Sequence, residues 1–342
     1  MVIEVAVENK ATEAKTEPKV LLELQGIKKY FPIKGGVLQR KQGEVKAVDN
    51  VSLKLFEGES LGVVGESGCG KSTLGRAVLG LEELSEGKIF FQDHEIQDLK
   101  RKEKLQFVKQ MQMIFQDPFA SLNPRQRIGH ALEEVFTMHT DMSAKEKRET
   151  VLSLLKEVGL KEEHFYKYPH EFSGGQRQRI GIARAIALNP SFVICDEAVS
   201  ALDVSVQAQV LKLLKSLQEK YQLSYMFISH DLGVVRYFCD RVLVMYLGNT
   251  VELGSVKDLF DKPLHPYTQA LLSAIPRPTV NRNRTRIRLQ GDLPNPANPP
   301  SGCPFHTRCP IATESCAAQK PEWKEYEPNH FAACHFAGKS IV

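Results

Sequence analysis

A glycine-rich turn between an apolar strand and a helix constrains the fold of this chain more than any other feature. Residues 61–64 form an apolar run that predicts a buried strand, and Gly65, Gly70, Lys71 and Ser72 follow in the spacing G-x-x-x-x-G-K-[ST]. Apolar residues then recur at helical spacing at Leu74, Ala77, Val78 and Leu81. The order of strand, glycine loop and helix predicts a phosphate-binding loop in an α/β fold.

The chemistry of such a loop follows from its backbone. Glycines let successive N–H groups curl around phosphate oxygens, and the helix that follows adds a positive end of about half a charge. Lys71 would reach the β- and γ-phosphates and is expected to be catalytic, and the Ser72 hydroxyl would bind Mg²⁺, whereas the Cys69 thiol is expected to be a bystander. The loop residues predicted to surround the nucleotide are Gly65, Glu66, Ser67, Gly68, Cys69, Gly70, Lys71, Ser72 and Thr73.

Two adjacent acids meet a second requirement of nucleotide hydrolysis. In the segment "FVICDE", Asp196 ends a run that predicts a buried strand, and it would hold Mg²⁺ directly or through water. Its neighbour Glu197 projects in a different direction, so it would polarise the attacking water as general base.

The segment "HEFSGGQRQRIGIARA" predicts another helix start that can bind an anion. Ser173 is a good N-cap residue, and Gly174 with Gly175 exposes backbone N–H groups in the first helical turn. The chain thus carries two elements of this kind, separated by about a hundred residues.

The remaining apolar patterns extend the α/β prediction. Half-buried antiparallel strands are expected between residues 20 and 58, and residues 111–115 alternate as in a strand. Ser143 and Glu146 form a capping box that opens a helix, which Gly159 closes. Buried strands are expected at "FVICDE" and "SYMFISHD", with a helix over residues 206–221 between them, and a hairpin is expected to turn near Gly248 and Asn249.

Taken in order, these motifs resemble those of ATP-binding-cassette ATPases. The resemblance covers about residues 20–275 and includes "GESGCGKST", Gln116 in "IFQDP", "FSGGQ", the acids of "FVICDE", "SALD" and His230 in "ISHD". It implies a RecA-like core with an antiparallel β subdomain and a helical subdomain that carries "FSGGQ". The family pairs two cassettes head to tail, so each ATP lies between the phosphate loop of one subunit and the "FSGGQ" segment of the other.

The resemblance also assigns roles to single residues. Ser173, Gly174, Gly175 and Gln176 would serve a nucleotide bound mainly to the partner chain. His230 would contact the γ-phosphate and position the water with Glu197, Gln116 would link Mg²⁺ to the transporter interface with residues 117–124, and Asp203 would link the two sites. Tyr30 would stack on adenine, with Phe31 as the rival and a plain core aromatic as the other interpretation. Ala198 stands where many cassettes have proline after the catalytic acid, so the preorganisation of Glu197 is open.

Compartment decides how the cysteines are interpreted. No apolar run approaches the roughly 18 residues of a spanning helix, and the acidic N-terminus lacks a signal-peptide core, so we expect a cytosolic chain with reduced thiols. The net charge of +4 is too small to indicate nucleic acid as a partner. Cys303, Cys309, Cys316 and Cys334 would then converge on one metal centre, and their spacing leaves Zn²⁺ and an iron–sulfur cluster open.

The C-terminal part resembles a narrower group, the ATPase subunits of bacterial dipeptide and oligopeptide importers. The segments that carry this resemblance are "PFASLNP", "YPHEFSGGQ", "KPLHPYTQALLSAIP" and "NPPSGCPFHTRCP". It implies a [4Fe–4S] cluster on the four cysteines, with Zn²⁺ as the alternative, in a structural role. His306, His330 and His335 are expected to be solvated loop residues, with replacement of one cysteine ligand as the alternative.

These expectations define three segments and one function. Residues 1–18 would be a flexible tail, residues 19–275 the nucleotide-binding domain and residues 276–342 a small Cys-rich module. The chain would hydrolyse MgATP at the cytoplasmic face of the cell membrane to drive peptide uptake. The resemblance implies a heterodimer with a related ATPase, two permease subunits and an external peptide-binding protein. The alternatives are an importer of nickel or another solute, a soluble ABC ATPase and a metal-dependent redox sensor.

Overall fold

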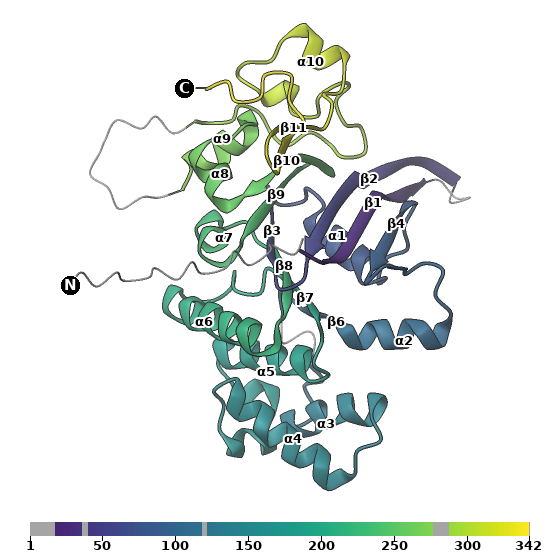
Figure 1. The fold of residues 1–342 in the computed structure, drawn as a ribbon, viewed down its shortest axis with the longest axis vertical. Coiled ribbons are helices and arrows are strands. Elements are labelled where there is room, and N and C mark those ends of the chain that lie inside the picture. Colours follow the sequence, from purple (N-terminus) through teal and green to yellow (C-terminus); the bar gives the residue numbers. More distant parts are fainter. Residues whose placement is uncertain (1–17, 36–39, 118–121, 276–286, 342) are drawn as a thin grey trace, which may run out of the picture.

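The computed structural model describes residues 18–35, 40–117, 122–275 and 287–341. Most of the expected tail and the junction at residues 276–286 therefore lie outside the described residues, and the domain boundaries stay predictions. The described chain is elongated, with helices α3 (Ile128–His139) and α4 (Ala144–Glu157) at one end of its long axis and the C-terminal residues at the other (Figure 1). The strands of the nucleotide-binding core lie between these ends.

A mixed sheet forms the centre of the molecule. Among the described residues its eight strands follow the order β11-β12-β10-β9-β3-β8-β7-β6. Its parallel part runs from β9 to β6 and contains the apolar runs recognised in the sequence, which lie buried between helices. The bounds of these parallel strands are Ser60–Val64 (β3), Met111–Ile114 (β6), Phe192–Asp196 (β7), Ser224–Ile228 (β8) and Arg241–Tyr246 (β9).

Helices pack against both faces of this parallel sheet and follow its strands in the chain. The phosphate-loop helix α1 (Lys71–Val78) follows β3, and α6 (Val204–Tyr221) connects β7 to β8. Leu81, expected on α1, lies beyond the helix and is 59% exposed because Gly80 adopts a positive φ of 69° and turns the chain. The remaining helices on this part of the chain are α2 (Arg101–Gln110), α7 (Leu232–Phe238), α8 (Val256–Asp261) and α9 (Pro266–Ser273).

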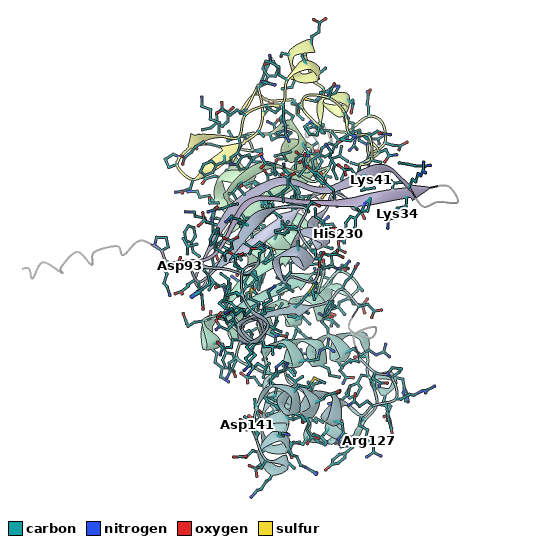
Figure 2. All side chains as sticks on the ribbon, turned by 90° about the vertical axis from the view of Figure 1, so that its right-hand side faces the viewer. Lys34, Lys41, Asp93, Arg127, Asp141 and His230 are labelled. Atoms are coloured by element: carbon teal, nitrogen blue, oxygen red, sulfur yellow. The ribbon has the colours of Figure 1, made fainter. Side chains whose placement is uncertain are left out.

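The smaller sheet confirms the antiparallel strands expected near the N-terminus. Its order is β2-β1-β4-β5, and β1 (Val20–Gly35) pairs with β2 (Arg40–Phe56) along a long hairpin. Figure 2 shows Lys34 and Lys41 near the tip of this hairpin, away from the body of the protein. The other two strands are β4 (Glu86–Phe91) and β5 (His94–Glu95).

A helical part separates β6 from β7 in the chain. It contains α3, α4, the short turns η1 (Glu162–Tyr166) and η2 (Pro169–Glu171), and α5 (Gly174–Ile186). The Ser143–Glu146 capping box is confirmed, since the Ser143 hydroxyl accepts from the Glu146 amide and the Glu146 carboxylate accepts from the Ser143 amide. Phe115, expected in β6, lies after the strand and is 36% exposed.

The C-terminal residues add strands to the central sheet. The predicted hairpin is confirmed, with β10 (Asn249–Ser255) antiparallel to β9, and β12 (His330–Ala332) then pairs with β10 through Glu252–Ala332 and Leu253–Phe331. β11 (Lys324–Glu327) completes the edge, and η3 (His306–Arg308) and α10 (Glu314–Ala318) precede it. Cys303, Phe305 and Cys316 pack into the main apolar core of the protein. Across the described residues, no helix combines the length and apolar character needed to cross a membrane.

Candidate nucleotide-binding site

The phosphate loop connects the buried strand β3 to α1, and its conformation depends on glycine. Gly65 and Gly70 have φ values of 152° and 103°. A Cβ atom at Gly65 would lie 2.2 Å from the Met245 carbonyl oxygen, and one at Gly70 would lie 2.0 Å from the Ala47 carbonyl oxygen. The loop therefore fits between β9 and β2 only because these two residues lack side chains.

Lys71 folds back over the loop that it follows. Its ammonium group donates to the carbonyl oxygens of Gly65 and Glu66 at 2.9 and 3.0 Å, and the side chain is almost fully buried. Cys69 lies beside this group, with its sulfur 3.8 Å from the Lys71 ammonium nitrogen, and burial raises the pKa of the thiol. A protonated, buried thiol is consistent with the bystander interpretation of Cys69.

A hydroxyl and a carboxylate meet at the carboxyl edge of the sheet, next to this loop. The Ser72 hydroxyl donates to Oδ1 of Asp196 at 2.6 Å, which joins the first turn of α1 to the end of β7. Burial raises the pKa of Asp196, while the hydrogen bond from Ser72 acts in the opposite direction. The Ser72 hydroxyl oxygen and the Asp196 carboxylate oxygen thus lie side by side, and both are oxygen ligands of the kind that Mg²⁺ prefers.

Glu197 collects the next two candidate residues around its carboxylate. Oε2 of Glu197 accepts from the Gln116 side-chain amide at 3.0 Å and lies 3.4 Å from Nδ1 of His230. Figure 2 places His230 at mid-height in the molecule, between the C-terminal residues and the helical part that carries Arg127 and Asp141. A carboxylate held between an amide and an imidazole is suited to orient a water molecule and accept its proton.

The backbone at Glu197 is held in the left-handed region. Its φ is 48°, its amide donates to the Ile228 carbonyl at 3.0 Å, and its carbonyl accepts from the Ser200 amide at 3.1 Å. Such a conformation is strained for a residue with a side chain and persists because neighbouring contacts fix it. Ala198, which replaces the common proline, is buried. Hydrogen bonds on both sides of Glu197 thus orient the residue without that proline.

The second helix start has the expected cap. Ser173 is the N-cap of α5, with its hydroxyl accepting from the Gln176 amide and its own amide donating to the Gln176 side chain at 3.1 Å. Ser173 and Gly174 are exposed, and so is Asp203, the N-cap of α6. The hydrogen bonds of Ser173 go to Gln176 and Arg177 in the first turn of the same helix. The start of α5 therefore faces solvent in the described chain.

Tyr30 lies on the strand next to the phosphate loop. It pairs with Lys46 of β2, one residue from Ala47, whose carbonyl oxygen contacts Gly70. The Tyr30 hydroxyl donates to Asp49 at 2.6 Å, and burial followed by that carboxylate raises its pKa. Its ring lies under the Lys46 ammonium group, and the Phe31 ring lies under Lys29. Stacking of either ring on a base stays a prediction.

An open groove of about 360 Å³ lies beside Gln116. Gly174 at the start of α5 also lines it, together with Ala198 and Leu202. Residues 118–121, part of the segment expected to contact a permease, lie outside the described residues. Two of the expected permease contacts, Gln116 and Asp117, therefore line this groove.

Sequence reasoning did not predict a group of contacts that joins the C-terminal residues to the phosphate loop. Arg308 forms a two-pronged ion pair with Glu66, and the Tyr267 hydroxyl accepts from the Glu66 amide at 2.8 Å. Both contacts span about two hundred residues or more of sequence. The one sequence signal that could have pointed to Arg308 is its position directly before Cys309.

The four C-terminal cysteines line one small cavity. Cys303, Cys309, Cys316 and Cys334 all contribute to its wall, together with His265, Phe305, His306 and His335, and all four are free thiols. Burial raises the pKa of Cys303 to about 11 and that of Cys334 to about 12. In the described part of the chain, however, no three His, Cys, Asp or Glu side chains are arranged to hold a metal ion.

One histidine prediction is wrong. His330 is not a solvated loop residue but is fully buried in β12, where Nε2 lies 2.8 Å from Oε1 of Glu252. The same carboxylate accepts from the amides of Leu264 and His265, each at 2.8 Å. Burial is explained by the pairing of β12 with β10, which brings His330 into the core beside Gly254. His335 is exposed and His306 is partly exposed.

The chain resembles known proteins along most of its length. A family model of ABC transporters matches residues 48–200, and a model of the C-terminal region of oligopeptide/dipeptide transporters matches residues 251–316. The oligopeptide transport ATP-binding protein AppF of Bacillus subtilis is 56% identical over 93% of this chain and 97% of its own length. The dipeptide transport ATP-binding protein DppF of Haemophilus influenzae is 51% identical over 92% and 96%.

Solved structures show the same fold at lower identity. A dimeric ATP-binding cassette in a post-hydrolysis state, bound to ADP and phosphate, matches with a TM-score of 0.62 and 28% identity over 69% of this chain and 99% of that one. A component of an ABC transporter complex from Clostridium perfringens matches with a TM-score of 0.61 and 26% identity, over 72% and 92%. With the geometry above, these likenesses confirm the ATP-binding-cassette fold, and the chain belongs to the oligopeptide and dipeptide transport ATP-binding proteins of the ABC transporter family.

Proposed function

We propose that this chain binds and hydrolyses MgATP to power the uptake of dipeptides or oligopeptides. The observation that carries the proposal is the meeting of three parts at one sheet edge: the phosphate loop, the Ser72–Asp196 pair and the Glu197 carboxylate with Gln116 and His230. The likeness to named peptide-transport ATPases along nearly the whole chain supports peptides as the transported solute.

Nucleotide binding begins with an exchange of partners at Lys71. Its ammonium group rests on two loop carbonyls, so a polyphosphate entering the loop offers it stronger, charged acceptors. The loop amides and the N-terminus of α1 would bind the phosphate oxygens, and the Tyr30 ring would stack on the base. The loop amides and Tyr30 would bind and orient the substrate, whereas Lys71, at the β- and γ-phosphates, is also a proposed catalytic residue together with Glu197 and His230.

The residues present fit Mg²⁺ as the cofactor. Ser72 and Asp196 supply oxygen donors that already lie 2.6 Å apart, and Gln116 adds an amide oxygen on the same side of the sheet. When bound there, Mg²⁺ would neutralise charge on the phosphate oxygens. Asp196 is buried, so a cation is the natural partner for its ionised form.

Glu197 is the proposed general base. Its carboxylate would accept the proton of the attacking water, and His230 would hold that water in line with the γ-phosphate. Gln116 donates to the same carboxylate oxygen, so a movement of Gln116 would change the orientation of the base. The groove beside Gln116 would therefore connect permease contact to hydrolysis.

The exposure of Ser173 and Gly174 in the "FSGGQ" segment supports an assembly of two ATPase chains. Ser173, Gly174, Gly175 and Gln176 would complete the site of a related second ATPase, and Asp203 would join the two sites. We propose a heterodimer at the cytoplasmic face of the cell membrane, bound to two permease subunits that receive peptide from an external binding protein.

Transport in vesicles tests the proposed function. The chain would be reconstituted with its candidate permeases, second ATPase and binding protein, and ATP hydrolysis would be measured with and without peptide. Peptide-dependent hydrolysis together with peptide accumulation is expected. Hydrolysis that responds to nickel or another solute, while peptide has no effect, would contradict the assignment of peptides.

We further propose that the cysteine cavity holds a structural [4Fe–4S] cluster. The fit is partial: four thiols line one cavity, which is the ligand number and type of such a cluster, but they are not arranged around a single ion. A single Zn²⁺ therefore fits less well, and cluster binding must release protons because burial keeps thiols protonated. When bound, the cluster would tie residues 303–334 together.

Anoxic purification tests this part separately. The full-length protein should absorb broadly near 400 nm and contain about four iron atoms per chain. Cys316→Ser should lower both the absorbance and the iron content, whereas Cys239→Ser, in the core away from the cavity, should change neither. Colourless protein with stoichiometric zinc would contradict the proposal.

A further inference from the structure

A residue of the cysteine segment, residues 303–334, forms an ion pair with the phosphate loop. Arg308 ends η3, next to Cys309, and its guanidinium group donates to both carboxylate oxygens of Glu66 at 2.7 and 3.2 Å. Only 9% of the Arg308 side chain is exposed. Such two-pronged, partly buried pairs are stronger than solvent-exposed ion pairs and fix the geometry of both partners.

Glu66 is held at each of its polar groups. Its amide donates to the Tyr267 hydroxyl at 2.8 Å, its carbonyl accepts from Lys71 at 3.0 Å, and its carboxylate binds Arg308. Two of these three partners, Tyr267 and Arg308, come from the region that matches the C-terminal transporter family rather than the cassette itself. The second residue of the phosphate loop is therefore positioned largely by the C-terminal region.

Packed aromatic rings connect this contact to the cysteine cavity. Phe305 lines the cavity and packs on Tyr246 and Tyr267 with ring centroids 5.2 and 5.3 Å apart. The Arg308 amide donates to the Phe305 carbonyl at 3.0 Å, and its guanidinium lies over the Tyr246 ring. Since Cys303 and Cys309 flank this stretch, the cavity wall and the arginine belong to one rigid unit.

The negative charge of Glu66 gives the ion pair with Arg308 a role in nucleotide binding. A carboxylate on a loop that receives a triphosphate would repel the ligand, and the repulsion is strong where water is partly excluded. Arg308 neutralises Glu66 and draws its side chain toward the C-terminal region. We propose that Arg308 is a positioning residue that acts through Glu66 to keep the phosphate loop able to bind MgATP, and that it links the cysteine segment to nucleotide affinity. This inference rests on the proposed role of the loop.

Double substitution separates this role from a general effect on folding. In the full-length protein, purified anoxically, Arg308→Gln should raise the dissociation constant of MgATP about tenfold, measured by calorimetric titration. Adding Glu66→Gln should restore the constant to within about threefold of wild type, because the uncompensated carboxylate is then gone. Arg308→Lys should be intermediate, since an ammonium group keeps the charge but loses the fork.

A matched ion pair at the other end of the same strand provides the control. Glu59, the residue before β3, forms a partly buried ion pair at 3.0 Å with Arg241 of β9, whereas Glu66 follows β3. Arg241→Gln should lower the melting temperature about as much as Arg308→Gln but change MgATP affinity less than twofold. The inference is overturned if Arg308→Gln binds MgATP within twofold of wild type, or if Glu66→Gln fails to restore the lost affinity.

A further variant keeps this failure distinct from that of the proposed site. Lys71→Ala should lose MgATP binding by about a hundredfold or more, because it removes the charge that the phosphates meet first. If Lys71→Ala binds as wild type does, the loop is not the nucleotide site and both proposals fail. If Lys71→Ala loses binding while Arg308→Gln does not, only the inference about Arg308 fails.

Discussion

The two helix starts that can bind anions differ in how their own chain treats them. The start of α1 is enclosed: its loop contacts β2 and β9 at two glycines, Lys71 is buried, and Arg308 binds Glu66. The start of α5 is open, with Ser173 and Gly174 exposed and a Cβ at Gly174 meeting only Leu202 at 3.8 Å. One helix start is thus covered by contacts with distant segments of its own chain, whereas the other is exposed, as the proposed sharing of a site between two chains requires.

The largest effect is expected at the enclosed end. Glu197→Gln should lower ATP turnover of the assembled transporter by about 10²–10⁴-fold, because the amide cannot accept the proton of the attacking water. MgATP should stay bound, since the phosphate loop is unchanged. Hydrolysis and retained nucleotide would be measured together, with the exposed Glu219→Gln as control. Undiminished turnover in Glu197→Gln would refute its assignment as base.

The next largest effect is expected on stability, at the pair of Glu252 and His330 between β10 and β12. Glu252→Ala removes the acceptor of His330 and of two backbone amides. Removing one partner of such a buried pair should lower the free energy of unfolding by about 3–5 kcal/mol. Urea unfolding would measure it, with the exposed Glu325→Ala on neighbouring β11 as control. A loss below about 1 kcal/mol would show that the pair contributes little to anchoring β12.

The open helix start should respond differently from the closed one. Gly174→Asp leaves room for its side chain and adds an acid where a helix dipole tolerates it, so folding should be retained. The MgATP affinity of the isolated chain should stay within twofold, while turnover of the assembly should fall about tenfold or more because the acid repels the partner's phosphates. Equal affinity and equal turnover would mean that α5 meets no nucleotide.

The smallest effect is a pH dependence near the open start. His164 packs on Phe172, which precedes Ser173, and its Nδ1 accepts from the Lys161 amide. Burial lowers the pKa of His164 in the folded chain. As the pH falls below the unfolded-state pKa of about 6.5, the unfolded chain therefore binds more protons than the folded one, and the free energy of unfolding decreases. His164→Asn should therefore flatten the stability profile between pH 7 and 5. An unchanged profile would contradict this role.

Local sequence patterns predicted the parts of the site whose structure depends on residues close by in the sequence. The phosphate loop, the acids after β7 and the Ser173 cap each occupy a short stretch, where strand burial, glycine freedom and capping are set by sequence spacing. The site residues themselves stay proposals, because their roles require a bound nucleotide.

Contacts between distant segments could not be predicted in this way. The pairing of Glu66 with Arg308 joins residues 242 positions apart, and the burial of His330 depends on β12 lying beside β10. Neither follows from periodicity, because each depends on the register in which a late segment returns to the central sheet. The error at His330 arose for this reason, since its own sequence surroundings look like a loop.

The most direct test is a structure of the assembled importer that carries Glu197→Gln and MgATP. The account predicts that Lys71 leaves the Gly65 carbonyl to contact the β- and γ-phosphates, and that Ser173 faces a nucleotide held mainly by the other ATPase chain. The account would be contradicted if Lys71 still lay on its own loop with nucleotide bound elsewhere, or if Ser173 faced solvent in the closed assembly.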